Sequence, residues 1–216
     1  MKTSGASSVA GARERLIEAA GEVFGQQGFH GATVREITKR AGVNLAAINY
    51  YFRDKEELYW VVLQHAVSCT LKSDVTASED ATPEEQLEIF ITKILHNMMD
   101  PNRPDWHGKL ISREMSEPTR MLDIIVESHI RPRSEKLRGI LRELAGIPLT
   151  SEQESLFSAS VMAQCLYYRQ NYAVVERLHP NLLKRKDPIT YIAKHITQFS
   201  LAAVKGLMSA GMFASI

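Results

Sequence analysis

The feature that most constrains the fold is a pair of short helical segments joined by a glycine turn, in the stretch TVREITKRAGVNLAAINYYF, which begins at Thr33. Thr33 followed by Glu36 is the pattern of a capping box and predicts the start of the first segment. Gly42 can adopt the left-handed conformation that ends a helix and opens a tight turn. Asn44 is a favoured capping residue, so we expect the second segment to begin there and to end near Tyr51. Two helices joined this closely predict a helix-turn-helix unit.

Apolar residues recur at helical spacing through this stretch and predict the buried side of the unit. They are Val34, Ile37, Ala41, Val43, Ile48 and Phe52. Two such short helices cannot bury these side chains alone, so the unit requires a third wall. We expect the preceding helix, residues 12–27, to supply it, with Gly28 ending that helix. Its apolar residues are Leu16, Ile17, Ala20, Val23 and Phe24.

The remainder of the chain also has helical periodicity. No stretch shows sustained alternation of apolar and polar residues, so the predicted fold class is all-α. Further helices are expected over residues 54–65, 83–99, 106–115, 117–146 with a kink at Pro132, 152–175 and 188–208. The polar, acidic stretch SDVTASEDATPEE predicts a linker, and LHPNLLKRKDP predicts a loop.

Length and composition limit the function classes. With 216 residues and 44% hydrophobic content, the chain can bury a sizeable core. Its formal net charge is only +1, so any nucleic-acid surface must be local. No apolar run reaches the ~18 residues of a membrane-spanning helix, and the start of the chain lacks the apolar core of a secretory signal. Cys69 and Cys165 are far apart and form no CxxC pattern, which favours a reducing cytoplasm over a disulfide framework.

One face of the second short segment remains outward once the buried side is assigned. It consists of Asn44, Leu45, Ala46, Ala47, Asn49, Tyr50 and Tyr51. A helix face this small and uncharged fits into a DNA major groove. Side chains at the edge of that face must then donate hydrogen bonds or positive charge to the DNA phosphates. Such donors are Thr33, Asn49, Tyr51 and Lys55, with Arg35, Lys39, Arg40 and Arg53 nearby. Each side chain alone is equally an ordinary solvated residue, so the prediction of a DNA-binding surface depends on the whole set. Between His30 and Lys55 there are five Lys/Arg and two Asp/Glu, a local net charge of +3.

The segment FGQQGFHGATVREITKRAGVNLAAINYYFRDKEELY resembles the TetR family of bacterial transcriptional regulators. The shared pattern consists of Phe24, Gly28-Phe29, Thr33, Ile37, Ala41-Gly42-Val43, a tyrosine pair with an aromatic residue, and Lys55-Glu56-Glu57-Leu58. The resemblance implies an N-terminal DNA-binding domain, a homodimer, and a C-terminal pocket whose ligand controls DNA affinity. By position, it implies base-facing roles for Leu45, Ala46 and Ala47. It implies phosphate contacts for Thr33, Asn49, Tyr51 and Lys55.

This face differs in two ways from what DNA recognition by the family would lead us to expect. Asn49 stands where the family commonly has a tyrosine, so its contact to the DNA backbone is expected to be shorter or mediated by water. Leu45 and the two alanines after it cannot make bidentate hydrogen bonds to bases. We therefore expect readout from thymine methyl contacts, DNA shape and backbone fit, with Asn44 as the one additional candidate.

The C-terminal half is expected to hold the ligand. The stretch DWHGKLISREMSEPT resembles the C-terminal domain of a TetR subgroup linked to antibiotic sensitivity and efflux control. A pocket for a small molecule needs apolar or aromatic side chains with a few polar tips. The candidates are Met98, Met99, Trp106, His107, Leu110, Met115, Phe157, Met162 and Tyr168. Ordinary core packing is the alternative for each of them. Arg113 and Glu114 predict a partly buried ion pair, with a ligand anchor as the alternative.

The last two long helices predict the dimer interface. Their apolar faces contain Phe157, Val161, Gln164, Cys165 and Tyr168 on one helix, and Ile192, Ile196, Phe199, Ala203 and Leu207 on the other. Two such pairs would form an isologous four-helix bundle. Packing entirely within one chain is the alternative.

Together these features predict three parts: a flexible arm over 1–11, a three-helix helix-turn-helix DNA-binding domain over 12–56, and a larger helical ligand-binding and dimerisation domain over 57–216. The expected function is that of a ligand-responsive transcriptional repressor, released from a palindromic double-stranded operator by a small, largely apolar effector. We expect a cytoplasmic homodimer with no cofactor, metal or membrane partner. A constitutive DNA-binding protein without ligand control is the alternative, and a helical enzyme is a weaker one, because no GxSxG, phosphate-loop or HExxH pattern occurs.

Overall fold

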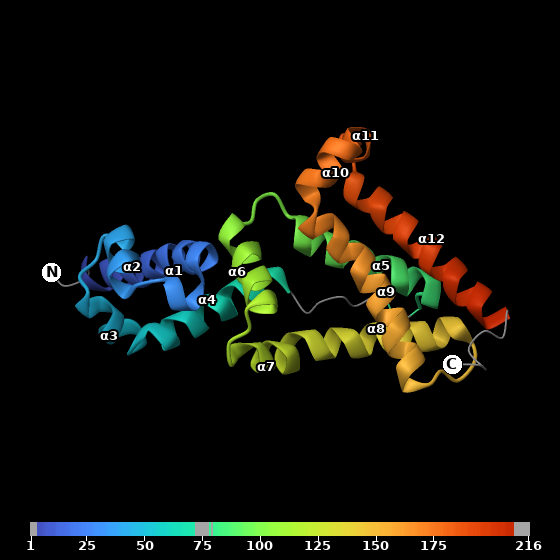
Figure 1. Ribbon diagram of the computed structural model, residues 1–216, viewed down its shortest axis with the longest axis horizontal. Helices are drawn as coiled ribbons and strands as arrows, with labels where there is room; N and C mark the ends of the chain where they lie inside the picture. Colours follow the sequence, from blue (N-terminus) through green and yellow to red (C-terminus); the bar gives the residue numbers. More distant parts are fainter. Residues whose placement is uncertain (1–3, 72–77, 79, 210–216) are drawn as a thin grey trace. The chain divides into compact units, whose positions relative to one another are not determined.

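The computed structural model describes residues 4–71, 78 and 80–209 (Figure 1). Every regular element in this part of the chain is a helix, so the predicted all-α class is confirmed. None of the helices described is long and apolar enough to span a membrane. The residues divide into two compact units, Met1–Lys72 with Asn102–Ser128, and Ser73–Pro101 with His129–Ile216. We call them unit 1 and unit 2. This packing boundary differs from the functional boundary predicted between residues 56 and 57.

Unit 1 contains the two short helices and their surroundings. Its helices are α1 (Ser4–Gly31), α2 (Val34–Ala41), α3 (Ala46–Phe52), α4 (Lys55–Thr70), α6 (Asp105–Ser116) and α7 (Met121–Ile125). The predicted inward residues Ile37, Ala41, Ile48 and Phe52 are buried, while Val34 and Val43 are half-buried. Helices α1, α4 and α6 pack on one another in this unit. The third wall predicted from α1 is therefore present, and α6 adds a further wall that the sequence did not predict.

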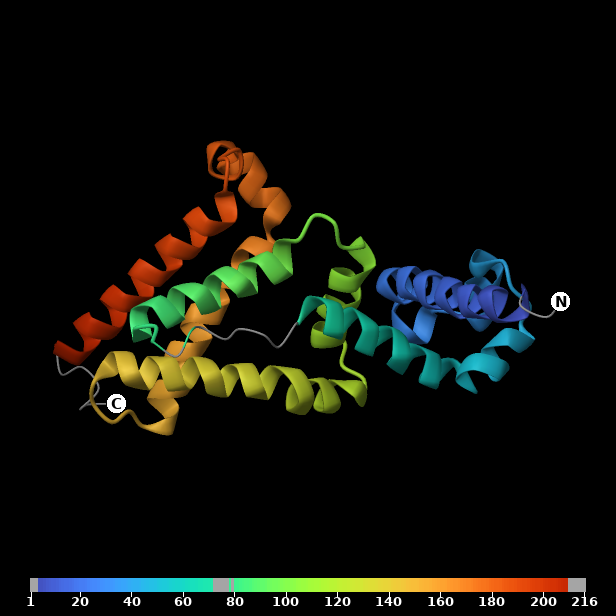
Figure 2. The same cartoon turned by 180° about the vertical axis from the view of Figure 1, so that it is seen from behind.

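Unit 2 is built around α5. Its helices are α5 (Pro83–Met99), α8 (Arg131–Ala145), α9 (Ser151–Gln170), α10 (Tyr172–Leu178), α11 (Pro180–Leu183) and α12 (Pro188–Ser209). Seen from both sides, α5 lies between α8 and α12 (Figures 1 and 2). Leu87, Phe90, Ile91, Leu137, Cys165 and Ile196 are among its core residues. The π-helix Val126–Ile130 leads from α7 into α8.

Local capping explains why most helices begin where the sequence predicted. The Thr33 hydroxyl accepts a 3.2 Å bond from the Glu36 amide. The Glu36 carboxylate does not complete a capping box and instead accepts two bonds from Gln27, of 2.9 and 3.0 Å. Asp54 caps α4 through the Glu57 amide at 2.8 Å. Complete capping boxes open α5 and α9, at the predicted starts of both helices.

Several predicted boundaries are wrong, each for a local reason. The first helix is predicted to begin at residue 12, whereas α1 begins at Ser4; its predicted end is confirmed, because Gly28 leaves helical geometry with φ 74° and ψ 177°, and a separate short turn continues to Gly31. The helix predicted over 152–175 is two helices, because Asn171 leaves helical geometry at φ −107°, ψ 23°. The predicted loop LHPNLLKRKDP contains α11. The irregularity predicted at Pro132 is the π-helix that precedes it. Residues 73–77 and 79 of the predicted linker lie outside the described residues, and its last three residues, from Pro83, already belong to α5.

The predicted dimer faces of the last two helices need correction. Phe157, Val161, Cys165, Ile192 and Ile196 are buried in the core of unit 2. The alternative of packing within one chain is therefore correct for these five residues. Phe199 differs, since 58% of its surface is exposed.

Candidate nucleic-acid interface

The turn between α2 and α3 fixes the candidate recognition helix. Gly42 has φ 64°, so the turn contains the left-handed residue that the sequence predicted. The Gly42 amide donates to the Lys39 carbonyl and so closes the end of α2. The Asn44 side-chain oxygen accepts a 2.9 Å bond from the Ala46 amide. Leu45 occupies the capping position itself, so the cap of α3 lies one residue later than predicted. The Asn44 oxygen nevertheless caps its own helix, while the amide nitrogen of that side chain can still donate to DNA.

The outward face of α3 agrees with the face predicted from the sequence. Leu45 is 56% exposed and Tyr50 is 76% exposed, and Ala46 and Asn49 are exposed as well. Ala47 and Tyr51 are half-buried. The Tyr50 and Tyr51 rings meet edge to face, with centroids 4.8 Å apart. Large apolar side chains left in water by a helix whose other face is buried mark a surface for a partner.

The positive charge near α2 is distributed unevenly. Arg40 forms ion pairs with Glu22 at 3.1 Å and with Glu36 at 3.6 Å. Arg35 and Lys39 are exposed, and within the described part of the chain neither has an ion-pair partner. Lys39 and Arg35 are therefore the cations of α2 that are available to phosphates, whereas Arg40 stabilises the packing of α2 on α1.

Lys55 lies on an aromatic ring rather than in an ion pair. Its ammonium nitrogen is 4.7 Å from the centroid of the Phe29 ring, a cation–π contact. Burial lowers the pKa of Lys55 from its usual value. The Phe29 ring in turn meets Tyr59 at 5.1 Å. A cation fixed in this way at the start of α4 can contact a phosphate without first losing much side-chain freedom.

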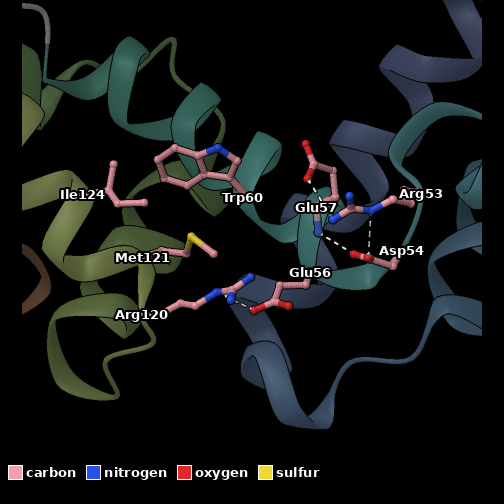
Figure 3. A pocket seen from close by; sticks show the side chains of 8 residues that line it. All are labelled: Arg53, Asp54, Glu56, Glu57, Trp60, Arg120, Met121 and Ile124. Carbon is pink, nitrogen blue, oxygen red and sulfur yellow. Dashed lines mark hydrogen bonds and ion pairs between the residues drawn. The ribbon is translucent and has the colours of Figure 1, made fainter.

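The start of α4 also borders a shallow groove, drawn in Figure 3, with a volume of about 330 Å³. Arg53 pairs with Asp54 at 3.3 Å and with Glu57 at 3.9 Å, and Glu56 pairs with Arg120 at 2.7 Å. The groove is lined by these five residues and by Trp60, Met121 and Ile124. The ion pair to Arg120 ties the α6–α7 connection to the N-terminal end of α4. No local pattern in the sequence indicates it.

Helix α6 supplies two of the polar contacts inside unit 1. The Trp106 indole nitrogen donates to Glu18 at 2.8 Å. Glu114 is 0% exposed, and it accepts bonds from the Tyr59 hydroxyl at 2.5 Å and from the Thr119 amide at 2.9 Å. Burial and the bond to Glu114 raise the pKa of Tyr59 above its usual range, so the phenol remains a donor.

The predicted ion pair between Arg113 and Glu114 is wrong, because each of the two residues has a different partner. Arg113 instead pairs with Glu117 at 2.8 Å and donates to the Gln26 carbonyl at 3.2 Å. The Glu114 carboxylate is held by neutral donors. Spacing in the sequence could not distinguish these possibilities, because one donor, Tyr59, comes from α4 and the other, Thr119, comes from the connection after α6.

The nine predicted ligand contacts do not lie in one unit. Trp106, His107, Leu110 and Met115 belong to unit 1, and Met98, Met99, Phe157, Met162 and Tyr168 belong to unit 2. Trp106 and Leu110 are buried in unit 1, and Phe157 is buried in the core of unit 2. Met98, Met99, Met162 and Tyr168 pack half-buried against that core. Their role as effector contacts remains a prediction.

His107 is the most unusual of these residues. Only 3% of it is exposed, and neither ring nitrogen has a hydrogen-bond partner in the structure. Burial, with a smaller effect of His65, lowers the pKa of His107 to about 4. The ring is therefore neutral at pH 7. Within the described residues, no group of three His, Cys, Asp or Glu side chains could hold a metal ion.

Exposed apolar side chains gather on the outer faces of α9 and α12. Tyr167 on α9 and Tyr191 and Phe199 on α12 are each close to half exposed or more, as is Leu156 at the start of α9. The two helices contact each other, with Gln164 and Ser200 joined by a 3.4 Å bond. This set, which we call the α9–α12 face, consists of Leu156, Leu166, Tyr167, Tyr191 and Phe199.

Comparison with known proteins agrees with this geometry. Residues 16–60 match the family described as bacterial regulatory proteins, tetR family, and residues 83–204 match the C-terminal domain of the HTH-type transcriptional dual regulator CecR. The chain is 29% identical to CecR of Shigella flexneri over 169 residues, which are 73% of this chain and 75% of that protein. It is 30% identical to the regulator BetI of Rhizobium meliloti over 165 residues, 74% and 77% of the two chains.

One solved structure illustrates the shared fold. The transcriptional regulator FadR from Bacillus subtilis, solved in complex with stearoyl-CoA, superposes with a TM-score of 0.59 at 19% identity. The match covers 88% of this chain and 97% of FadR. At this identity the likeness establishes the fold alone.

Proposed function

The chain belongs to the TetR family of bacterial transcriptional regulators, and from this premise we propose that it is a ligand-responsive repressor acting as a homodimer on a palindromic operator. Family membership makes it a DNA-binding regulator and not an enzyme. A regulator of bacterial transcription works on DNA in the cytoplasm. The effector is a small, largely apolar molecule.

The observation that carries DNA binding is the division of α3 into two faces. Ile48 and Phe52 are buried, whereas Leu45, Ala46 and Tyr50 are exposed. In this proposal Leu45, Ala46 and Ala47 face the base edges. Thr33, Arg35, Asn49, Tyr51 and Lys55 contact phosphates, and Asn44 and Tyr50 lie at the edge of the groove. Small apolar side chains read thymine methyl groups and DNA shape rather than hydrogen-bond patterns.

The α9–α12 face supports dimerisation with a second copy. Monomeric proteins rarely leave contiguous large apolar side chains in water. Phe199 and Tyr191 lie two helical turns apart along α12, and Tyr167 is exposed on α9, which contacts α12. A second copy presents the same surface in an isologous contact. The buried residues of these helices hold unit 2 together instead.

Ligand control is supported by the character of unit 2. Met98, Met99, Met162 and Tyr168 are half-buried against its core. Methionine side chains adapt readily to apolar ligands. FadR, which shares the fold, forms a complex with stearoyl-CoA. An apolar effector in unit 2 is therefore the form of control that we propose.

A combined measurement tests ligand control against constitutive binding. Apolar compounds, including fatty acyl thioesters, are screened for those that raise the melting temperature of the purified dimer. Ligand control predicts that at least one stabilising compound lowers operator affinity over the same concentration range. Stabilising compounds that all leave operator affinity unchanged support the constitutive alternative.

A further inference from the structure

We propose that Glu114 is a positioning residue for DNA binding, which acts through Tyr59 and Phe29 to hold Lys55 at the DNA backbone. The inference rests on the proposed DNA-binding function. It assigns to α6 a part in the phosphate contact made by α4. Glu114 itself does not touch DNA in this account.

The first step is the burial of the Glu114 carboxylate. A buried carboxylate is costly unless donors satisfy both oxygens. One oxygen of Glu114 accepts from the Tyr59 hydroxyl at 2.5 Å. The other accepts from the Thr119 amide and hydroxyl, each at 2.9 Å. Three donors therefore fix the carboxylate, and the carboxylate fixes the Tyr59 hydroxyl.

The second step is the aromatic cluster around Tyr59. Its ring meets Phe24 edge to face at 4.9 Å and Phe29 at 5.1 Å. Phe29 directly follows Gly28, where α1 departs from helical geometry. The backbone hydrogen bonds of α1 therefore constrain Phe29 less than they constrain Phe24. The Phe29 ring is held by its neighbours instead, Tyr59 at 5.1 Å, His30 at 5.3 Å and Phe24 at 6.4 Å, and of these Tyr59 is the one that Glu114 fixes.

The third step joins this cluster to the cation. The Lys55 ammonium lies 4.7 Å from the Phe29 centroid, so the orientation of that ring determines where the charge sits. Contacts run without a gap from Glu114 to Lys55, and all four residues belong to unit 1. A chain of contacts does not by itself demonstrate coupling. A double-mutant cycle measures it.

The cycle combines Tyr59→Phe, which removes only the hydroxyl, with Lys55→Ala. Operator affinity and its salt dependence are measured for wild type, both single variants and the double variant. We expect Tyr59→Phe to weaken binding about three- to tenfold and to lower the salt slope by a fraction of one phosphate contact. In the Lys55→Ala background, the same change should leave affinity unaltered. Tyr172→Phe, which removes an exposed hydroxyl in unit 2 at a residue outside every proposed contact, is the control and should leave affinity unchanged.

A second variant covers the case in which Tyr59→Phe perturbs folding. Phe29→Leu keeps the bond between Tyr59 and Glu114 but removes the ring beneath Lys55, and it should show the same dependence on Lys55. Losses that persist undiminished in the Lys55→Ala background overturn the inference, because Tyr59 then serves only stability. Wild-type binding that Lys55→Ala leaves unchanged overturns it as well, with the proposed function intact. Absence of any wild-type DNA binding contradicts the proposed function itself.

Discussion

The indole ring of Trp106 lies so close to Gly21 that a Cβ atom there would come within 2.4 Å of the ring. This contact joins α6 to α1 inside unit 1. In the sequence, α6 falls within the segment that matches the CecR C-terminal domain. It nevertheless belongs to unit 1, where it packs on α1 and α4. Substitutions on α6 are therefore expected to affect the DNA-binding unit directly.

The close contact at Gly21 gives the first prediction. Gly21→Ala should lower the free energy of unfolding by about 1–3 kcal/mol, because the added methyl group collides with a buried ring. Gly25→Ala is a matched control on the same helix, since its Cβ would stand an ordinary 3.5 Å from its nearest neighbours. Replacing this helical glycine should stabilise the protein by about 0.5–1 kcal/mol. Urea unfolding of both variants checks the pair, and equal stabilities would show that Trp106 moves aside.

The buried imidazole of His107 gives a prediction about pH. Its pKa falls from 6.5 to about 4 in the folded protein. Between these values the unfolded chain binds a proton that the native state does not, so stability is lost as pH falls from 6.5 towards 4. The loss should be on the order of 2–3 kcal/mol. His107→Leu should lose less stability over the same interval, measured by urea unfolding at each pH. An identical pH dependence in both proteins would assign the effect to other groups.

The ion pair between Glu56 and Arg120 is expected to contribute little to stability. The Arg120 side chain is 71% exposed and that of Glu56 is 45% exposed, so water screens the attraction. A double-mutant cycle with Glu56→Ala and Arg120→Ala should give a coupling energy of about 0.2–1 kcal/mol, reduced further in 1 M salt. A coupling energy above about 2 kcal/mol, insensitive to salt, would contradict this expectation.

The dimer interface can be tested without disturbing the core. Phe199→Glu changes a residue that is 58% exposed, and it should produce a folded monomer in sedimentation. Ile147→Glu, at a 53% exposed residue outside the α9–α12 face, should remain a dimer. Cys165→Glu is unsuitable, because Cys165 is 0% exposed and the charge would unfold unit 2. If Phe199→Glu remains dimeric at low micromolar concentration, the interface lies elsewhere.

Local signals explain how much of the fold the sequence could predict. Gly42, Asp54, Thr82 and Thr150 act through partners a few residues away, so the turn and three helix starts were predictable. Periodicity also identified the buried side of the helix-turn-helix. On α3 the large apolar residues Ile48 and Phe52 are four residues apart and therefore lie on one face, which is buried.

Contacts between distant segments account for what could not be predicted. Helix α9 has apolar side chains on both sides: Phe157 is buried in unit 2, whereas Leu156 and Tyr167 are exposed. Periodicity cannot determine which side faces a second copy. Similarly, nothing near Trp106 or Glu114 in the sequence indicates that their partners are Glu18 and Tyr59.

Selection of binding sites from random duplex DNA tests the central claim most directly. The purified protein is incubated with a random-sequence library, and bound duplexes are recovered and sequenced over several rounds. Our account predicts enrichment of an inverted repeat whose half-sites are separated by about one helical turn, ~34–36 Å from centre to centre. A recovered pool without sequence enrichment, or an enriched site without two-fold symmetry, would contradict recognition by a dimer through α3.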